Sequence, residues 1–145
     1  MKTDVFKPGQ LIEEFAVEKD GKKMKVMFST RKLSDYKDST KFINKLVKEK
    51  VYLAVIDKQS LKQTKEHTIS LIKEMKKRKT IPLVVIVNGQ YKGSAEISKK
   101  KHGLSHIADL GIALDISIRN SGIGTRLMNI LMKLAKENFK TEIVT

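Results

Sequence analysis

Residues 119–125, with the sequence RNSGIGT, constrain the fold of this chain more than any other segment. They separate a long apolar segment at 105–116 from a segment whose apolar residues recur at helical spacing. Gly122 and Gly124 let the backbone approach another group closely. The first amide groups of a helix have no acceptor within the helix, and the helix dipole adds about half a positive charge there. The segment therefore predicts a strand, a tight turn and a helix whose first turn can bind an anion.

The other strand signals predict two hairpins. Apolar and polar residues alternate through 24–31, and Asp20-Gly21 precedes them as a turn after an extended segment at 11–17. Residues 83–87 are a continuous run of apolar, mostly β-branched residues, as expected for a strand covered on both faces. Asn88-Gly89 then predicts a tight turn into a returning strand at 91–98.

Two amphipathic segments between these hairpins predict helices. Their apolar residues recur at helical spacing: Tyr36, Ile43, Leu46 and Val47 in the first segment, and Leu61, Leu71, Ile72 and Met75 in the second. Residues 51–56 are either a strand or a connector, and 141–145 open a last strand. The order ββααβββαβ predicts one α/β domain over 1–145, with a mixed sheet flanked by helices.

Composition narrows the function without deciding it. The net charge of +14 favours polyanionic partners, which leaves a nucleic-acid-binding module as an alternative to a protein that binds a phosphorylated cofactor. The lysine runs lack the interleaved aromatic residues that stack on bases. There is no cysteine, and His67, His102 and His106 lack metal-site spacing, so we expect no metal. Without a signal peptide or an apolar run of membrane-spanning length, a cytoplasmic protein is expected.

Two familiar glycine motifs do not fit residues 119–125. A P-loop requires Gly-Lys-Ser/Thr, whereas Gly124 is followed by Thr125 and Arg126. A dinucleotide fingerprint requires a small residue where Leu127 stands. The segment instead resembles the pattern Arg/Gln-x-x-Gly-x-Gly/Ala of the GNAT superfamily of N-acetyltransferases. Residues 109–114 resemble the fourth strand of that family and the Asn88-Gly89 hairpin its second and third strands, so the likeness covers about 24–145.

This resemblance implies a GNAT-like acyl-CoA N-acyltransferase fold and acetyl-CoA as the cofactor. Residues 105–138 would form the acetyl-CoA-binding strand, turn and helix, and residues 1–22 an N-terminal strand and hairpin extension. The backbone of the strand would pair with the pantetheine arm, and one of its N–H groups would polarise the thioester carbonyl. The turn would hold the pyrophosphate through its amides, and Arg126 could add a charge. The implied cofactor-binding residues are Ile112, Ala113, Leu114, Arg119, Asn120, Ser121, Gly122, Ile123, Gly124 and Thr125.

The resemblance also implies catalytic residues. Many family members use an acidic residue early in the fourth strand to deprotonate the attacking amine, and Asp109 occupies that place. Because Asp is shorter than the commoner Glu, we expect it to act through a water. Glu96, on the preceding strand, is a second candidate.

Family members usually continue after the fifth strand with a helix and two strands, which supply a tyrosine that protonates the departing thiolate. The sequence reaches Thr145 within that strand, so the pattern is C-terminally incomplete and no residue takes this role. A non-catalytic CoA-binding subunit, or a homodimer that completes the sheet, is therefore an alternative. Otherwise we expect an N-acetyltransferase acting on a primary amine, either a protein N-terminus, a lysine or a small amine. The basic charge favours acidic acceptors over polycations.

Overall fold

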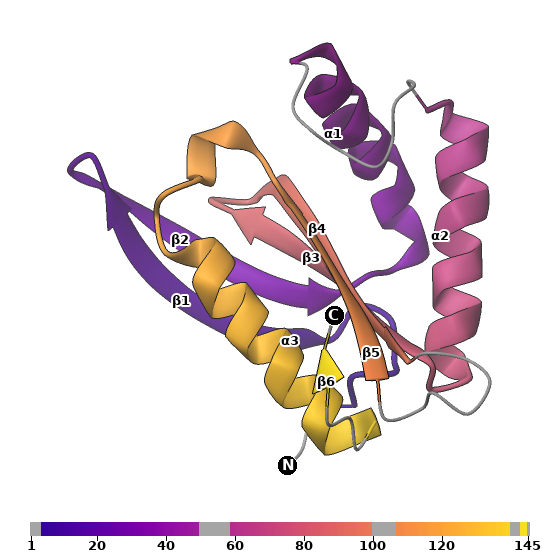
Figure 1. Cartoon of the computed structure of the whole chain (residues 1–145). Coiled ribbons are helices and arrows are strands. Elements are labelled where there is room, and N and C mark those ends of the chain that lie inside the picture. Colours follow the sequence, from indigo (N-terminus) through magenta and orange to yellow (C-terminus); the bar gives the residue numbers. More distant parts are fainter. Residues whose placement is uncertain (1–3, 50–58, 100–106, 140–142, 145) are drawn as a thin grey trace.

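The computed structural model describes residues 4–49, 59–99, 107–139 and 143–144. The predicted order of elements is confirmed, with two short 3-10 helices added (Figure 1). The segment at 51–56 and the loop around 100–103 lie outside the described residues. The elements are β1 Leu11–Lys19, β2 Lys22–Thr30, η1 Leu33–Asp35, α1 Tyr36–Lys48, α2 Leu61–Lys76, β3 Thr80–Val87, β4 Gln90–Lys99, β5 Ile107–Leu114, η2 Ile116–Ile118, α3 Ile123–Phe139 and β6 Ile143–Val144.

The described strands form one sheet in the order β1-β2-β3-β4-β5-β6. Neighbours are antiparallel except for β5 and β6, which are parallel. The two predicted hairpin turns are present, since Asp20 and Gly21 have φ values of 53° and 74°, and Asn88 and Gly89 of 49° and 80°. These left-handed conformations suit the twist of a two-residue hairpin, which explains why Asx-Gly pairs occupy both turns.

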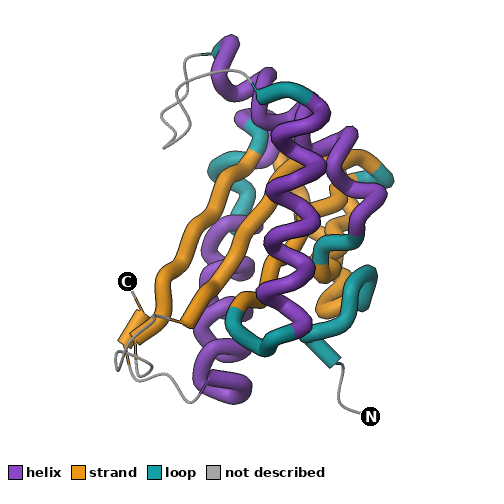
Figure 2. Tube along the Cα trace, turned by 90° about the vertical axis from the view of Figure 1, so that its right-hand side faces the viewer, coloured by secondary structure: helices purple, strands orange, loops and turns teal. Residues whose placement is uncertain are grey.

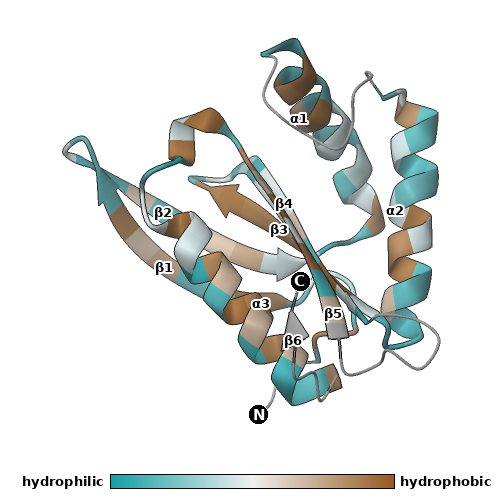
Figure 3. Cartoon of the chain, viewed as in Figure 1, coloured by the Kyte–Doolittle hydropathy of each residue, from teal (hydrophilic) through white to brown (hydrophobic). Residues whose placement is uncertain are grey.

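Helices cover the two faces of the sheet. Helices α1 and α2 lie on one face and α3 lies on the other (Figure 1, Figure 2). Strand β3, between them, is buried along almost its whole length, as its continuous apolar run predicts. Helix α3 carries both apolar and polar residues (Figure 3), and its buried residues form a stripe at helical spacing. Its residues Ile123, Leu127 and Leu131 are each fully buried. Burial of such a side chain contributes roughly 1.5–3 kcal/mol, so this stripe fixes α3 and the turn before it against the sheet.

The strand expected over 105–116 is shorter at its C-terminal end, where the prediction was wrong by two residues. Strand β5 ends at Leu114, and residues 105 and 106 lie outside the described part of the chain. The backbone N–H of Asp115 still bonds to the carbonyl of Lys92 on β4, at 2.8 Å. Its side chain then accepts a hydrogen bond from the backbone N–H of Ser117 and caps η2. An aspartate that bonds the backbone two residues later starts a turn, so it ends the strand.

Candidate active site

The turn after β5 leaves open space and backbone donors at the start of α3. Gly122 has a φ of 87°, which favours glycine, and a Cβ placed on it would meet nothing within 4 Å. The first α-helical bond of α3 runs from the Arg126 N–H to the Gly122 carbonyl, at 3.1 Å. The amides of Gly124 and Thr125 have no acceptor among the described residues. These donors, at the positive end of the helix dipole, are suited to bind an anion.

Side chains of the same segment stabilise the turn from within. The Arg119 guanidinium donates from Nε and Nη2 to the carbonyl of Leu114, at 3.2 and 3.0 Å. The Ser121 hydroxyl donates to the carbonyl of Ile118. A Cβ on Gly124 would lie 3.2 Å from Cδ1 of Leu114, so a small residue here lets the helix start approach the strand end closely.

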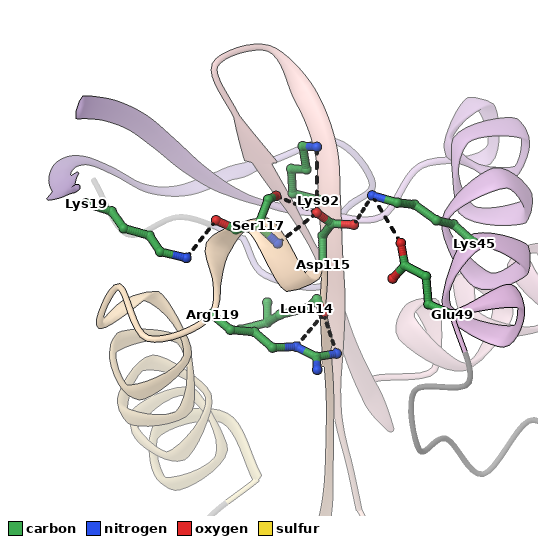
Figure 4. A network of polar contacts seen from close by, with 8 residues as sticks. All are labelled: Lys19, Lys45, Glu49, Lys92, Leu114, Asp115, Ser117 and Arg119. Carbon is green, nitrogen blue, oxygen red and sulfur yellow. Dashed lines mark hydrogen bonds and ion pairs between the residues drawn. The ribbon is translucent and has the colours of Figure 1, made fainter. Parts of the chain in front are cut away.

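A buried carboxylate lies between β5 and the turn (Figure 4). The side chain of Asp115 is 2% exposed and pairs with Nζ of Lys45 on α1 at 2.8 Å and with Nζ of Lys92 on β4 at 3.8 Å. It also accepts hydrogen bonds from the backbone and hydroxyl of Ser117. Burial raises the pKa of Asp115, but the hydrogen bonds from Lys45 and Ser117 outweigh burial and lower this pKa to about 2. Asp115 therefore carries a negative charge at neutral pH and joins α1, β4 and η2.

Two cations near the turn have different surroundings. Lys19, at the end of β1, donates from Nζ to the carbonyl of Ser117 at 3.0 Å (Figure 4). Arg126 was expected to add its charge to the anion site, but its guanidinium contacts Glu13 on β1, with nitrogen–oxygen distances of 2.7 and 3.2 Å. It also lies 4.0 Å from the ring centre of Phe15. The side chain of Arg126 therefore connects the first turn of α3 to β1.

The edge of β5 that faces away from β4 is partly open. Among the described residues, strand β6 pairs with β5 at two positions, Ile107 with Ile143 and Ala108 with Val144. From Gly111 to Leu114, no strand in the described part of the chain pairs with that edge. Backbone groups on an unpaired edge can bond an extended ligand as they would bond a further strand. The open edge contains Ile112, Ala113 and Leu114, and the glycine turn follows it along the chain.

A cavity of about 280 Å³ lies between the helices α1 and α2 and the strands β3, β4 and β5. Gly111, Ile112 and Ala113 line it from β5, and Glu96 lines it from β4. The remaining lining residues come from β4 and from four further places in the chain: Arg31, Ser39, Ile43, His67, Leu71, Pro82, Ser94 and Ala95. The cavity thus brings one of the two acidic residues singled out in the sequence to the open segment of β5.

The structure places Asp109 and Glu96 on adjacent strands and on the same face of the sheet. Glu96 is opposite Gly111, and Asp109 is opposite Ser98, two positions further along β4. Cross-strand partners share a face, and residues two apart along a strand share it too. Glu96 is half-buried and lines the cavity, whereas Asp109 is exposed and is not among the residues that line it.

Two charged residues of this region were missed in the sequence. Asp115 was treated as part of a strand, although Asp115-Ile116-Ser117 has the spacing of an aspartate turn. Arg31 was treated as one of the alternating polar residues of the strand predicted at 24–31, but it follows β2, is 5% exposed and lines the cavity. Nothing in the local sequence distinguishes Arg31 from the surface cations. Among the described residues, no group of three His, Asp or Glu side chains could hold a metal, and His102 and His106 lie outside them.

A mixed sheet with an open strand edge, followed by a glycine turn and a helix start, defines the acyl-CoA N-acyltransferase class of fold. The chain belongs to the GNAT acetyltransferase family, the acetyl-CoA-dependent N-acetyltransferases, whose family model matches residues 49–145. A comparison with curated protein sequences gave no significant match. In the described residues, no helix is long and apolar enough to cross a membrane.

Solved structures share the fold at low sequence identity. Mycobacterium smegmatis RimJ in complex with CoA-disulfide has a TM-score of 0.72 and 15% identity, over 100% of this chain and 70% of that one. A GNAT-family acetyltransferase from Streptococcus pneumoniae has a TM-score of 0.66 and 18% identity, over 78% of this chain and 68% of that one. A third structure is an acetyltransferase from Salmonella typhimurium that modifies the N-terminal serine of a 50S ribosomal subunit protein. It has a TM-score of 0.64 and 16% identity, over 77% of this chain and 64% of that one. The chain therefore spans about two thirds of these structures.

Proposed function

We propose that this chain transfers an acetyl group from acetyl-CoA to a primary amine held in the cavity between α1, α2 and the sheet. The observation that carries this proposal is the position of Glu96 in the same cavity as the open segment of β5. An acceptor amine in that cavity lies between a carboxylate and the backbone that would align the acyl donor. Such placement of both reactants is a main source of rate enhancement in enzymes.

The residues around the turn fit a pyrophosphate. The open space at Gly122 and the amides of Gly124 and Thr125 would hold the two phosphates, with Lys19 nearby as a cation. Residues Ile112, Ala113 and Leu114 would bond the pantetheine arm along the open edge of β5. Bound acetyl-CoA would supply the thioester: its acetyl carbon would bond to the amine nitrogen, the carbon–sulfur bond would break, and coenzyme A would leave as a thiolate that takes a proton from solvent.

In this proposal Glu96 is the general base. An amine must lose a proton before its lone pair can attack, and a carboxylate that lines the cavity can accept that proton directly or through a water. A backbone N–H of β5 would donate to the carbonyl oxygen as negative charge develops there. Asp109, on the same sheet face, is the second candidate base and would act through a water.

We favour the N-terminal amine of a protein as the acceptor, ahead of lysine and small amines. The Salmonella typhimurium acetyltransferase with the same fold modifies a protein N-terminus. The net charge of +14 would also attract an acidic protein and repel a polycationic amine.

Thermal shift and single-variant kinetics test this function. Acetyl-CoA should raise the unfolding temperature of the wild type, because a ligand that binds the native state stabilises it. Glu96→Gln should keep that shift but lower the acetylation rate about 10²–10⁴-fold, and the rate should recover at higher pH as the free amine becomes abundant. Asp109→Asn is the matched comparison. An unchanged rate in Glu96→Gln would rule out its role as base, and the absence of any acetyl-CoA shift would refute the transferase function.

A further inference from the structure

Arg31 is a buried cation in the wall of the proposed acceptor cavity. It follows the last residue of β2, and its backbone N–H bonds to the carbonyl of Pro82 on β3, at 2.8 Å. The residue is 5% exposed and lines the cavity that also contains Glu96. An arginine side chain stays protonated at physiological pH, so this position places a full positive charge at the cavity wall.

The partners of this guanidinium are all neutral hydroxyl groups. Nη1 donates to Ser39 on α1 at 3.4 Å and to Thr68 on α2 at 3.2 Å, and Nη2 donates to Tyr91 on β4 at 3.0 Å. No carboxylate pairs with Arg31 among the described residues. Its buried Nε also lacks a hydrogen-bond acceptor there. The three hydroxyls fix the direction of the guanidinium but carry no charge that offsets its own.

A buried charge without a counterion is unfavourable, because the hydration lost on burial is not replaced. Such an arrangement is expected where a ligand supplies the missing negative charge. The guanidinium group also has the donor geometry for that task. The Nε–H and an N–H of Nη2 point in parallel from one edge of the guanidinium, the edge that binds the two oxygens of a carboxylate or phosphate.

We propose that Arg31 binds an oxyanion of the acceptor, so that the preferred substrate carries a carboxylate or phosphate close to its reactive amine. This proposal rests on the acetyl transfer proposed above. Within one cavity, Glu96 would receive the amine end of the acceptor and Arg31 its anionic end. The oxyanion could belong to a small amine or to an acidic side chain beside a protein N-terminus. Both sources present the same chemistry to the guanidinium.

Matched acceptors separate the two sources. One pair is a short peptide with a free N-terminus and aspartate or asparagine at its second position. The other is an aminoalkyl phosphate and the corresponding amino alcohol. With wild-type protein, the anionic member of at least one pair should have a KM roughly tenfold to a hundredfold lower, as expected for a charge-assisted hydrogen bond. If the enzyme prefers the anionic member of the peptide pair alone, the acceptor is a protein. If it prefers the anionic member of the phosphate pair alone, the acceptor is a small amine.

Variants show whether Arg31 causes the preference. Arg31→Gln should abolish it by raising the KM of the anionic acceptor towards that of the neutral one. Arg31→Lys keeps the charge without the paired donors and should retain part of the preference. Lys62→Gln removes one exposed charge from α2 and should leave the preference intact. No preference in the wild type, or an undiminished preference in Arg31→Gln, would overturn the proposal.

An equilibrium measurement keeps the test independent of turnover and of the stability of Arg31→Gln. With the pyrophosphate site saturated by coenzyme A, inorganic phosphate should raise the unfolding temperature more than chloride does at equal ionic strength. This difference should shrink in Arg31→Lys and persist in Lys62→Gln. Equal effects of phosphate and chloride on the wild type would count against the anion site. A response to acetyl-CoA without any oxyanion effect would refute only the role of Arg31, whereas no response to acetyl-CoA would refute the transferase function itself.

Discussion

Arg119 donates two hydrogen bonds to the backbone carbonyl of Leu114, from Nε at 3.2 Å and from Nη2 at 3.0 Å. Leu114 is the last residue of β5, and Arg119 begins the turn that precedes α3. One side chain therefore closes the five-residue segment that connects the proposed pantetheine-binding strand to the proposed pyrophosphate-binding turn. The arginine of the motif bonds the backbone, and in the proposed site the phosphate donors are the amides that follow it.

Replacing Arg119 tests this arrangement. Arg119→Gln should weaken acetyl-CoA binding by roughly fivefold to tenfold, because about 1 kcal/mol of hydrogen bonding that orders the turn is lost. Arg119→Lys should weaken binding almost as much, since an ammonium lacks the paired donors of a guanidinium. Isothermal titration with acetyl-CoA measures both. If Arg119→Lys bound acetyl-CoA as tightly as the wild type, the contribution of Arg119 to binding would come from its charge and not from its effect on the geometry of the turn.

The glycine of the turn has a matched control elsewhere in the chain. Gly122 and Gly21 both have left-handed φ values, 87° and 74°, and a Cβ on either would meet nothing within 4 Å. Gly122→Glu and Gly21→Glu therefore introduce similar backbone strain and the same charge. Only Gly122→Glu should abolish the thermal shift caused by acetyl-CoA, because its carboxylate would lie in the anion site. Loss of the shift in both variants, or in neither, would contradict the position assigned to the pyrophosphate.

Asp115 should make stability depend on pH in the acid range. Its folded-state pKa of about 2 lies below the ordinary value of 3.8. The ion pairs therefore stabilise the folded state at pH values above about 3.8, and this contribution is lost as the pH falls towards 2. From the pKa difference, the contribution is on the order of 2 kcal/mol. The free energy of unfolding of Asp115→Asn should be lower than that of the wild type at pH 6.

The difference between Asp115→Asn and the wild type should shrink between about pH 4 and pH 2, as measured by urea denaturation. Asp38→Asn, at an exposed position on α1, controls for the loss of one negative charge. A stability difference that stayed constant over this range would show that hydrogen-bond geometry, rather than the carboxylate charge, accounts for the effect of Asp115.

Two strand glycines should respond differently to alanine. A Cβ on Gly93 would lie 2.8 Å from the carbonyl oxygen of Ala113 and 2.8 Å from Cδ2 of Leu114, whereas a Cβ on Gly111 would lie 3.9 Å from Cγ of Glu96. Gly93→Ala should therefore lower the free energy of unfolding by about 1–3 kcal/mol. Gly111→Ala should change it by less than about 0.5 kcal/mol. Urea denaturation measures the free energy of unfolding of both variants. An equal loss in the two would show that replacing any strand glycine destabilises the sheet and that close packing at Gly93 is not the cause.

The sequence by itself determined the order of the elements, both hairpins and the position of the glycine turn. These features depend on residues that are close along the chain. Asx-Gly pairs favour left-handed turns, and Ile123, Leu127 and Leu131 recur at helical spacing, so local geometry suffices to predict them.

Tertiary structure decided how charge is distributed around the site. Lys45 and Asp115 are 70 residues apart, and Arg31 and Tyr91 are 60 residues apart. Arg126 was expected at the phosphates but contacts Glu13, which is 113 residues away. Whether a charge is buried, and which group it meets there, depends on how distant elements pack. The lysines and arginines of a basic chain look alike in sequence. Only the fold buries Arg31 in the wall of a cavity and brings Arg126 into contact with Glu13 on β1.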